Sequence, residues 1–313
     1  MDKLFESVAA KGHVCVGLDT AAEYLPAKER RQAASDAEAV LAYNIALVDS
    51  TFDAAACYKV QIAYYEEMGI AGLKTYAETL KYIRRKNGLV IADIKRGDIA
   101  DTALRYAKAH FEGDFEADFV TLSPYMGMDS IEPWISHNAN KGAFVLMRTS
   151  NKGMRDFEYL ELKGGSPPLA PNAEAFSATP PARRLYHAVG DKLSALAAAR
   201  QGAYGYGVFG AVVGCTEREE AAEIRAAYPD LFFLIPGYGA QGGAADDAAL
   251  LLREGNGGVV NASRSILKAW NTEVKNSGGD ESEVTVTFAA EAARRAALEM
   301  RDAIRNAAAN MGR

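Results

Sequence analysis

Short apolar runs, many of them rich in β-branched residues, alternate along the chain with longer stretches of helical periodicity. Runs of this length are typical of buried strands, whereas stretches rich in Ala, Leu, Glu, Lys and Arg with a period near 3.6 residues are typical of amphipathic helices. A helix is expected ahead of the first strand. The runs that predict strands are residues 13–18, 56–60, 89–93, 119–122, 143–147, 208–213, 231–235 and 258–262. The stretches that predict further helices are residues 30–50, 64–86, 100–112, 216–228, 243–254 and 284–308.

This alternation predicts repeated βα units and therefore an α/β protein. Eight parallel strands joined by helices close most naturally into a (β/α)8 barrel of the TIM class, whereas an open doubly wound sheet more often has about five to seven strands. The 313 residues exceed the ~100–200 of a usual domain, but barrels of this kind commonly reach ~250 or more. We predict a single barrel domain over residues 1–313, with two smaller domains as the alternative.

The connection between the fifth and sixth predicted strands, residues 151–207, is unusually long. It contains Gly164-Gly165-Ser166-Pro167-Pro168 and Thr179-Pro180-Pro181, followed by a helical stretch near 182–200. Barrel loops tolerate insertions and often carry function. We interpret residues 151–207 as a loop insertion within the barrel.

Composition excludes several classes of protein. Hydrophobic residues make up 49% of the chain and charged residues 24%, as in soluble globular proteins. The net charge of −6 argues against a broad nucleic-acid surface. The N-terminal residues lack the apolar core of a signal peptide, and no apolar run reaches the ~18 residues of a membrane span, so we expect a cytoplasmic protein without a membrane partner.

Neither the cysteines nor the histidines predict a metal site. Cys15, Cys57 and Cys215 lie in or beside apolar runs and form no Cys-x-x-Cys pair, so we expect small buried hydrophobic residues. The four histidines are scattered, without metal-ligand spacing. The sequence Gly205-Tyr206-Gly207-Val208-Phe209-Gly210 fits the dinucleotide-binding pattern, but it leads into a predicted strand rather than out of one, which argues against a nucleotide cofactor.

The third predicted strand runs directly into fixed charges. Asp93, Lys95 and Asp98 follow the apolar run, and Asp93 and Lys95, two residues apart, face the same side of a strand. Charges at the end of a buried strand are costly unless they pair with one another. The segment predicts either a paired functional cluster or, alternatively, a solvated loop with an incidental ion pair.

Other predicted strands also end in polar residues, which favours the functional interpretation. Active sites of (β/α)8 barrels lie at the carboxyl ends of the strands. Taken singly, a helix cap would explain Asp19 or Ser263, and a surface position would explain Lys59. Together they form one rim, and its members are Asp19-Thr20, Lys59, Arg148-Thr149-Ser150, Pro236 to Gly243, and Ser263-Arg264-Ser265.

The last two of these loops predict a phosphate site. In this fold, phosphate groups frequently bind to the loops after strands seven and eight. Here those loops contain glycines, Gln241 and Arg264, and the backbone N–H groups of Ser263 and Arg264 open a short helix. We therefore expect a phosphorylated small molecule as the ligand.

Together these motifs resemble those of the orotidine 5′-phosphate decarboxylase family, particularly its longer-chain bacterial branch. The resemblance covers the whole predicted barrel. It rests on Gly17-Leu18-Asp19, Lys59, Asp93-Ile94-Lys95-Arg96-Gly97-Asp98-Ile99-Ala100-Asp101-Thr102-Ala103, Arg148-Thr149-Ser150-Asn151, Pro236 to Gly242, and Ser263-Arg264-Ser265.

The resemblance implies a reaction and a role for each residue. Orotidine 5′-monophosphate would lose CO2 to give uridine 5′-monophosphate in de novo pyrimidine biosynthesis, with neither a metal nor an organic cofactor. Lys95 would protonate C6 between the carboxylates of Asp93 and Asp98, and Lys59 would pair with Asp93. The implied substrate ligands are Asp19 for the ribose, Ser150 or its neighbour Thr149 for the pyrimidine, and Pro236, Gln241, Ser263 and Arg264 around the nucleotide and its phosphate. The enzyme would be a homodimer in which Asp98 and Thr102 act in the neighbouring subunit's site.

Two other functions compete with this one. Magnesium-dependent sugar-phosphate decarboxylases and aldolases share the Asp-x-Lys-x-x-Asp motif, but a metal site would favour a carboxylate rather than Lys59 at the end of strand two. A non-catalytic phosphate-binding barrel would have no use for the charges of Asp93, Lys95 and Asp98.

Overall fold

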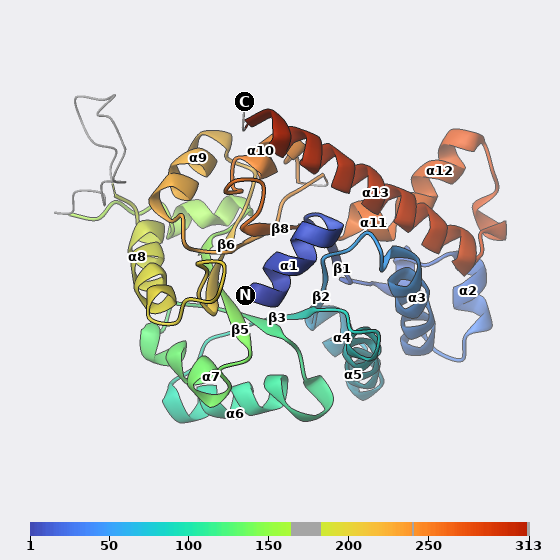
Figure 1. Cartoon of the computed structure of the whole chain (residues 1–313). Coiled ribbons are helices and arrows are strands. Elements are labelled where there is room, and N and C mark those ends of the chain that lie inside the picture. Colours follow the sequence, from blue (N-terminus) through green and yellow to red (C-terminus); the bar gives the residue numbers. More distant parts are fainter. Residues whose placement is uncertain (164–182, 240, 312–313) are drawn as a thin grey trace.

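The computed structural model describes residues 1–163, 183–239 and 241–311, and its core is a closed barrel of parallel strands in chain order (Figure 1). All eight predicted strands are present, which confirms the (β/α)8 TIM-barrel prediction. Their bounds are β1 Val14–Gly17, β2 Cys57–Gln61, β3 Val90–Arg96, β4 Phe119–Leu122, β5 Gly142–Arg148, β6 Phe209–Val213, β7 Phe233–Ile235 and β8 Gly258–Ala262.

Successive strand residues face opposite sides of the barrel wall. Cys15 and Cys57 pack inside the barrel, whereas Val14, Val16 and Tyr58 pack outward against the helices. Both sides of the wall are therefore buried, which is why the strands read as nearly continuous apolar runs in the sequence. Cys215 is also buried, so the expectation for all three cysteines is confirmed.

The helices surround the barrel, but several differ from the predicted ranges. Residues 30–50 form two helices, because Ser35 accepts a hydrogen bond from the Glu38 N–H (3.2 Å) and starts a new helix there. The range 243–254 shortens to a single short helix. The helices near residues 132 and 269 were not predicted, whereas the short helix that begins at Arg264 was expected. The helices are α1 Asp2–Lys11, α2 Ala27–Gln32, α3 Asp36–Thr51, α4 Ala63–Glu66, α5 Gly69–Arg85, α6 Ala100–Phe111, α7 Glu132–His137, α8 Leu185–Ala198, α9 Arg218–Ala227, α10 Ala245–Ala249, α11 Arg264–Leu267, α12 Ala269–Ser277 and α13 Val286–Met311.

Helix α1 closes the amino-terminal end of the barrel. Its residues Leu4 and Val8 are buried in the same apolar cluster as the interior side chains of the strands. The Ser7 hydroxyl donates a hydrogen bond to the carbonyl of Ala56, at the start of β2 (2.6 Å). This arrangement leaves the carboxyl ends of the strands as the open end of the barrel.

The long connection between β5 and β6 contains the regular helix of its βα unit. Helix α8 packs against both strands. Residues Gly164 to Pro168 and Thr179 to Pro181 lie outside the described residues, so the insertion at 151–207 stays a prediction. The segment Gly205 to Gly210 leads into β6 as expected. Among the described helices, none has the length and apolarity that crossing a membrane requires.

Candidate active site

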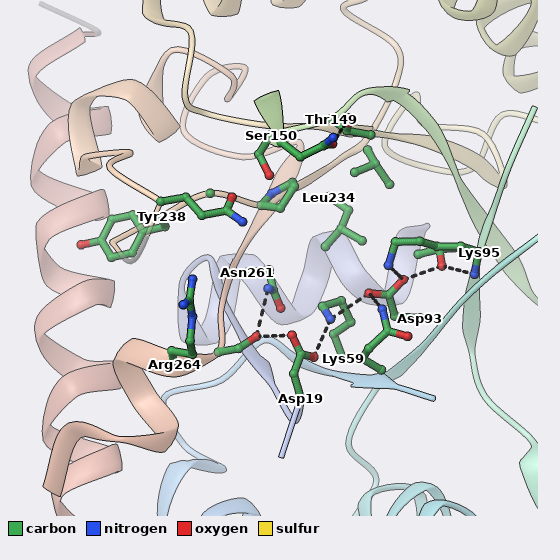
Figure 2. A pocket seen from close by; sticks show the side chains of 18 of the residues that line it. Asp19, Lys59, Asp93, Lys95, Thr149, Ser150, Leu234, Tyr238, Asn261 and Arg264 are labelled. Carbon is green, nitrogen blue, oxygen red and sulfur yellow. Dashed lines mark hydrogen bonds and ion pairs between the residues drawn. The ribbon is translucent and has the colours of Figure 1, made fainter. Parts of the chain in front are cut away.

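A cavity of about 460 Å³ opens at the carboxyl ends of the strands. Figure 2 shows its side chains converging from opposite walls. The residues that line it are Asp19, Tyr24, Lys59, Gln61, Tyr64, Asp93, Lys95, Thr121, Leu146, Thr149, Ser150, Asn151, Val212, Leu234, Pro236, Gly237, Tyr238, Gln241, Asn261, Ser263 and Arg264.

Strand alternation explains why these side chains point into the barrel. Cys57 faces the interior near the closed end, so Lys59 and Gln61, two and four residues further on, face it near the open end. Ile91 and Asp93 repeat the pattern in β3. The interior is therefore apolar beside α1 and polar at the rim.

Lysine and carboxylate side chains alternate along one wall of the cavity and form a continuous network of ion pairs (Figure 2). We call this wall the paired wall. The Lys59 ammonium lies between two carboxylates, 2.8 Å from Asp19 Oδ1 and 2.9 Å from Asp93 Oδ2. The Lys95 ammonium lies 2.7 Å from the other oxygen of Asp93. At the Asp19 end of this network, Ser263 donates a hydrogen bond to Asp19 Oδ2 (2.8 Å). These contacts bring together four of the predicted catalytic and ribose-binding residues.

Burial and pairing act against each other on these groups, and pairing prevails. Burial alone would lower the pKa of Lys59, but Asp19 and Asp93 raise it above its ordinary value. Burial alone would raise the pKa of Asp93, but Lys59, Lys95 and the Thr121 hydroxyl hold it well below the usual range of a carboxyl. Both groups are therefore charged at neutral pH, with opposite signs that compensate within the network.

The strand that carries Lys95 is longer than predicted. The apolar run ends at residue 93, but β3 continues to Arg96, and its register against β4 shifts on the way. Lys95 is 46% exposed at its side chain, so it reaches from the buried network into the open cavity.

On the wall opposite, Ser150 and Thr149 lie side by side but have different partners. The Thr149 hydroxyl contacts Glu158 (2.8 Å) and Asn151 (2.7 Å), and its backbone N–H donates to Glu158 as well (2.9 Å). The Ser150 hydroxyl has no hydrogen-bond partner among the described residues and points toward the cavity (Figure 2). The geometry therefore leaves Ser150, rather than Thr149, free for a ligand.

Arg264 and Tyr238 lie at the end of the cavity away from Lys95 (Figure 2), and Gln241 and Pro236 also line the cavity. The side chains of Gln241 and Arg264 are exposed and make no hydrogen bond or ion pair within the described part of the chain. A cationic guanidinium and an amide without partners suit an anionic ligand. This end of the cavity, with Ser150, is called the open wall below.

Ser263 precedes α11, as predicted, but its side chain makes no capping hydrogen bond to the helix. It turns instead to Asp19, which follows the neighbouring strand β1. Gly17 makes this contact possible, because a Cβ at Gly17 would collide with Ser263 Oγ. The Gly17-Leu18-Asp19 motif therefore has a steric reason for its glycine.

Asp98 and Thr102 do not line the cavity of their own chain. Asp98 accepts a hydrogen bond from the Ile99 N–H that follows it (2.8 Å), and Thr102 is exposed on α6. Their expected role in a neighbouring subunit stays a prediction.

Sequence reasoning missed several lining residues. Gln61 donates a hydrogen bond to Asp93 (3.0 Å), Thr121 does so from β4 (2.7 Å), and Asn261 donates to Ser263 (3.4 Å). The alternation of the strands offered a signal, since Gln61 lies two residues after Lys59 and Asn261 two before Ser263. Tyr24 and Tyr64 lie in segments outside the predicted strands, where no such pattern applies.

A (β/α)8 barrel with an ammonium and carboxylate array at its rim, and with an unpaired guanidinium at the far end of the same cavity, has the features of a class of barrel enzyme that acts on small anionic substrates. Comparison with known proteins gives the family. Residues 12–276 match the model of the orotidine 5′-phosphate decarboxylase / HUMPS family, and the chain belongs to this family.

The chain is similar to relatives that carry the name orotidine 5′-phosphate decarboxylase. It is 50% identical over 308 residues to the orotidine 5′-phosphate decarboxylase of Clostridium perfringens strain SM101, covering 98% of each chain. The enzyme of the same name from Clostridium kluyveri is 52% identical over 275 residues, or 87% of this chain and 89% of the other. Among solved structures, a putative orotidine 5′-phosphate decarboxylase from Streptomyces avermitilis has a TM-score of 0.75 at 27% identity, with 98% of this chain and 95% of the other covered. The OMP decarboxylase of Leishmania donovani has a TM-score of 0.72 at 29% identity, with 98% and 97% covered.

Proposed function

We propose that the chain decarboxylates orotidine 5′-monophosphate to uridine 5′-monophosphate and CO2, with Lys95 as the proton donor. Family membership and the 50% identity to curated decarboxylases support the reaction and its place in pyrimidine biosynthesis. The observation that carries the residue assignment is the Lys95 ammonium, paired with Asp93 yet exposed to the cavity.

The chemistry requires a cation at a fixed place. When the bond between C6 and the carboxylate carbon breaks, its electron pair remains on C6, and CO2 leaves. The pair then takes a proton from Lys95 Nζ, which becomes neutral, and a proton from solvent restores the ammonium. A preorganised ammonium stabilises the developing charge on C6 and supplies the proton to the same atom.

The other side chains would each bind a different part of the substrate. Asp19, at the end of the paired wall, would accept hydrogen bonds from the ribose hydroxyls. Ser150 would contact the pyrimidine, because Thr149 is already occupied by Glu158. Gln241 and Arg264 would hold the phosphate, beside Pro236 and Ser263. Contacts to a phosphate remote from C6 contribute to catalysis by positioning the reacting carbon.

The arrangement of donors favours this reaction over the magnesium-dependent alternative. In a metal site a cation would lie between the rim carboxylates, and here the Lys59 ammonium lies between Asp19 and Asp93. Within the described part of the chain, no group of three His, Cys, Asp or Glu side chains is placed to bind a metal ion.

The direct test is to measure CO2 release from orotidine 5′-monophosphate by purified protein in the presence of a chelator. We expect full turnover in the chelator and none with hexulose or pentulose phosphates. A strict requirement for added Mg²⁺, or reaction of a sugar phosphate only, would contradict the proposal.

We further propose a homodimer in which Asp98 and Thr102 complete the partner's site. Their position outside the cavity of their own chain supports this, as does Ile99 between them, a large apolar side chain that is 58% exposed. Mixing Lys95→Ala with Asp98→Ala protein should restore about a quarter of wild-type activity, since half of the exchanged dimers contain one intact site. No recovery after verified subunit exchange would contradict a shared site.

A further inference from the structure

The end of β3 departs from the regular barrel ladder at Lys95. The register between β3 and β4 shifts between Ala92 and Arg96, so that residues 93–95 of β3 lie opposite Thr121 alone. The strand is therefore bulged. At the bulge Lys95 has a φ of 45°, in the left-handed region that residues other than glycine seldom adopt.

The Thr121 hydroxyl takes over the hydrogen bonds that the bulge removes from the ladder. Its oxygen accepts from the backbone N–H groups of Ile94 and Lys95, both at 3.0 Å. Its proton goes to Asp93 Oδ1, at 2.7 Å. A hydroxyl has one donor and two acceptor positions, so Thr121, which is only 1% exposed, is fully used. Without it, the buried N–H of Ile94 and the partly buried N–H of Lys95 would lose the acceptor that replaces the ladder.

These three hydrogen bonds act on both ends of the Lys95 side chain. At the backbone end, the bond to the Lys95 N–H supports a conformation that persists only where the surroundings determine it. At the ammonium end, Asp93 Oδ1 is the same oxygen that Lys95 Nζ contacts at 2.7 Å. The Thr121 hydroxyl therefore fixes both the backbone conformation of Lys95 and the carboxylate oxygen that the Lys95 ammonium contacts.

We infer that Thr121 is a positioning residue for proton transfer, which sets the place of the Lys95 ammonium through the bulged backbone and the Asp93 carboxylate. This inference rests on the proposed function. A β-branched apolar residue would suit the β4 sequence Phe-Val-Thr-Leu equally well as a strand former, so the hydroxyl is the feature that needs an explanation.

The test compares Thr121→Val, which keeps the shape and removes the hydroxyl, with Thr121→Ser, which keeps the hydroxyl. We expect the valine variant to lose about 10²-fold in kcat, with KM for orotidine 5′-monophosphate close to that of the wild type, because the ammonium is misplaced while the substrate contacts remain. The serine variant should retain most of the activity.

The matched control is Thr75→Val. Thr75 is also buried, and its hydroxyl donates to the Ala37 carbonyl (2.8 Å), away from the cavity. This variant loses a buried hydrogen bond of similar kind but should keep the wild-type kcat. If Thr121→Val does not fold, Thr121→Ala replaces it, since alanine and serine at this position differ only by the hydroxyl.

A folded Thr121→Val or Thr121→Ala variant with near wild-type kcat would overturn the inference. So would a serine variant as impaired as the valine variant, or a loss that appears in KM alone. Failure of the proposed function is distinguishable, because the wild-type protein itself would then release no CO2 from orotidine 5′-monophosphate.

Discussion

The two walls of the cavity differ in how their charges are compensated before any ligand binds. On the paired wall, Asp19, Lys59, Asp93 and Lys95 compensate one another through contacts of 2.7 to 2.9 Å. On the open wall, the Arg264 guanidinium lacks any ion pair within the described residues. The first wall is ordered by the fold itself, whereas the second would be completed by the ligand under the proposed function.

This difference assigns the two walls different expected roles, the catalytic step to the paired wall and ligand binding to the open wall. A charge array that is already oriented in the free protein needs no rearrangement when charge develops on the reacting carbon. An unpaired guanidinium gains its partner only when an anion arrives, and so contributes to affinity and positioning. We therefore expect substitutions on the paired wall to lower kcat or stability, and substitutions on the open wall to act mainly through kcat/KM.

The largest effect is expected from Lys95→Ala. Loss of the proton donor should lower kcat by about 10³-fold or more. The thermal unfolding midpoint should change little, because Asp93 keeps Lys59, Gln61 and Thr121 as partners. Steady-state assays beside a thermal melt measure both quantities, with the exposed Lys81→Ala as control. Activity within a few fold of the wild type would rule out Lys95 as the donor.

The next largest effect is expected from Lys59→Met. This change leaves Asp19 and Asp93 without the ammonium between them, and removing one partner of a buried ion pair typically costs about 3–5 kcal/mol of unfolding free energy. Chemical denaturation measures this cost. The matched control is Lys28→Met, whose partner Glu283 is at the surface, where a pair contributes about 0–1 kcal/mol.

The pH dependence of the unfolding free energy of Lys59→Met tests whether the lost ion pairs cause its destabilisation. The lowered pKa of Asp93 contributes stability above the unfolded-state value of about 3.9, and this contribution is lost as the pH falls toward the folded value. The raised pKa of Lys59 contributes below about 10.4 and is lost as the pH rises through the folded value. The difference between wild type and Lys59→Met should therefore be constant from about pH 5 to pH 9. A difference that varies within this window would indicate another cause.

A smaller effect is expected from Arg264→Ala. Loss of charge-assisted hydrogen bonds to the phosphate should lower kcat/KM by about 10- to 100-fold, equivalent to roughly 1.5–3 kcal/mol. Stability should not change, since the guanidinium has no partner to lose within the described chain. Steady-state kinetics and a thermal melt test this. A large drop in the unfolding midpoint would show that Arg264 is structural.

The smallest effect separates Ser150 from Thr149. Ser150→Ala should raise KM by about 2- to 10-fold, as expected for one neutral hydrogen bond, and leave stability unchanged. Thr149→Val should instead lower the unfolding midpoint, because it removes the hydroxyl contacts to Glu158 and Asn151. The reverse pattern would assign the pyrimidine contact to Thr149.

The sequence predicted the barrel and most of the rim because both follow from local patterns. Each strand is a short apolar run, and the residue two positions past an interior side chain also faces the interior, as with Cys57 and Lys59. The split between α2 and α3 was not predicted, although Ser35 followed by Glu38 is a local signal for a helix start.

What the sequence could not predict depends on contacts between strands. The bulge at Lys95 requires the register of β4, and the use of Thr121 as a replacement for the ladder follows only from that register. The contact between Ser263 and Asp19 likewise joins β8 to β1 across the closure of the barrel. No spacing within a single segment encodes such pairs.

The most direct test of the division between the two walls is kcat/KM of wild type and Arg264→Ala for orotidine 5′-monophosphate and for orotidine, which lacks the phosphate. We predict that Arg264→Ala has a lower kcat/KM than the wild type for orotidine 5′-monophosphate but the same kcat/KM for orotidine. Lys95→Ala should be inactive on both substrates. An equal deficit of Arg264→Ala on both substrates would contradict the account, because Arg264 would then act on the chemistry rather than through the phosphate.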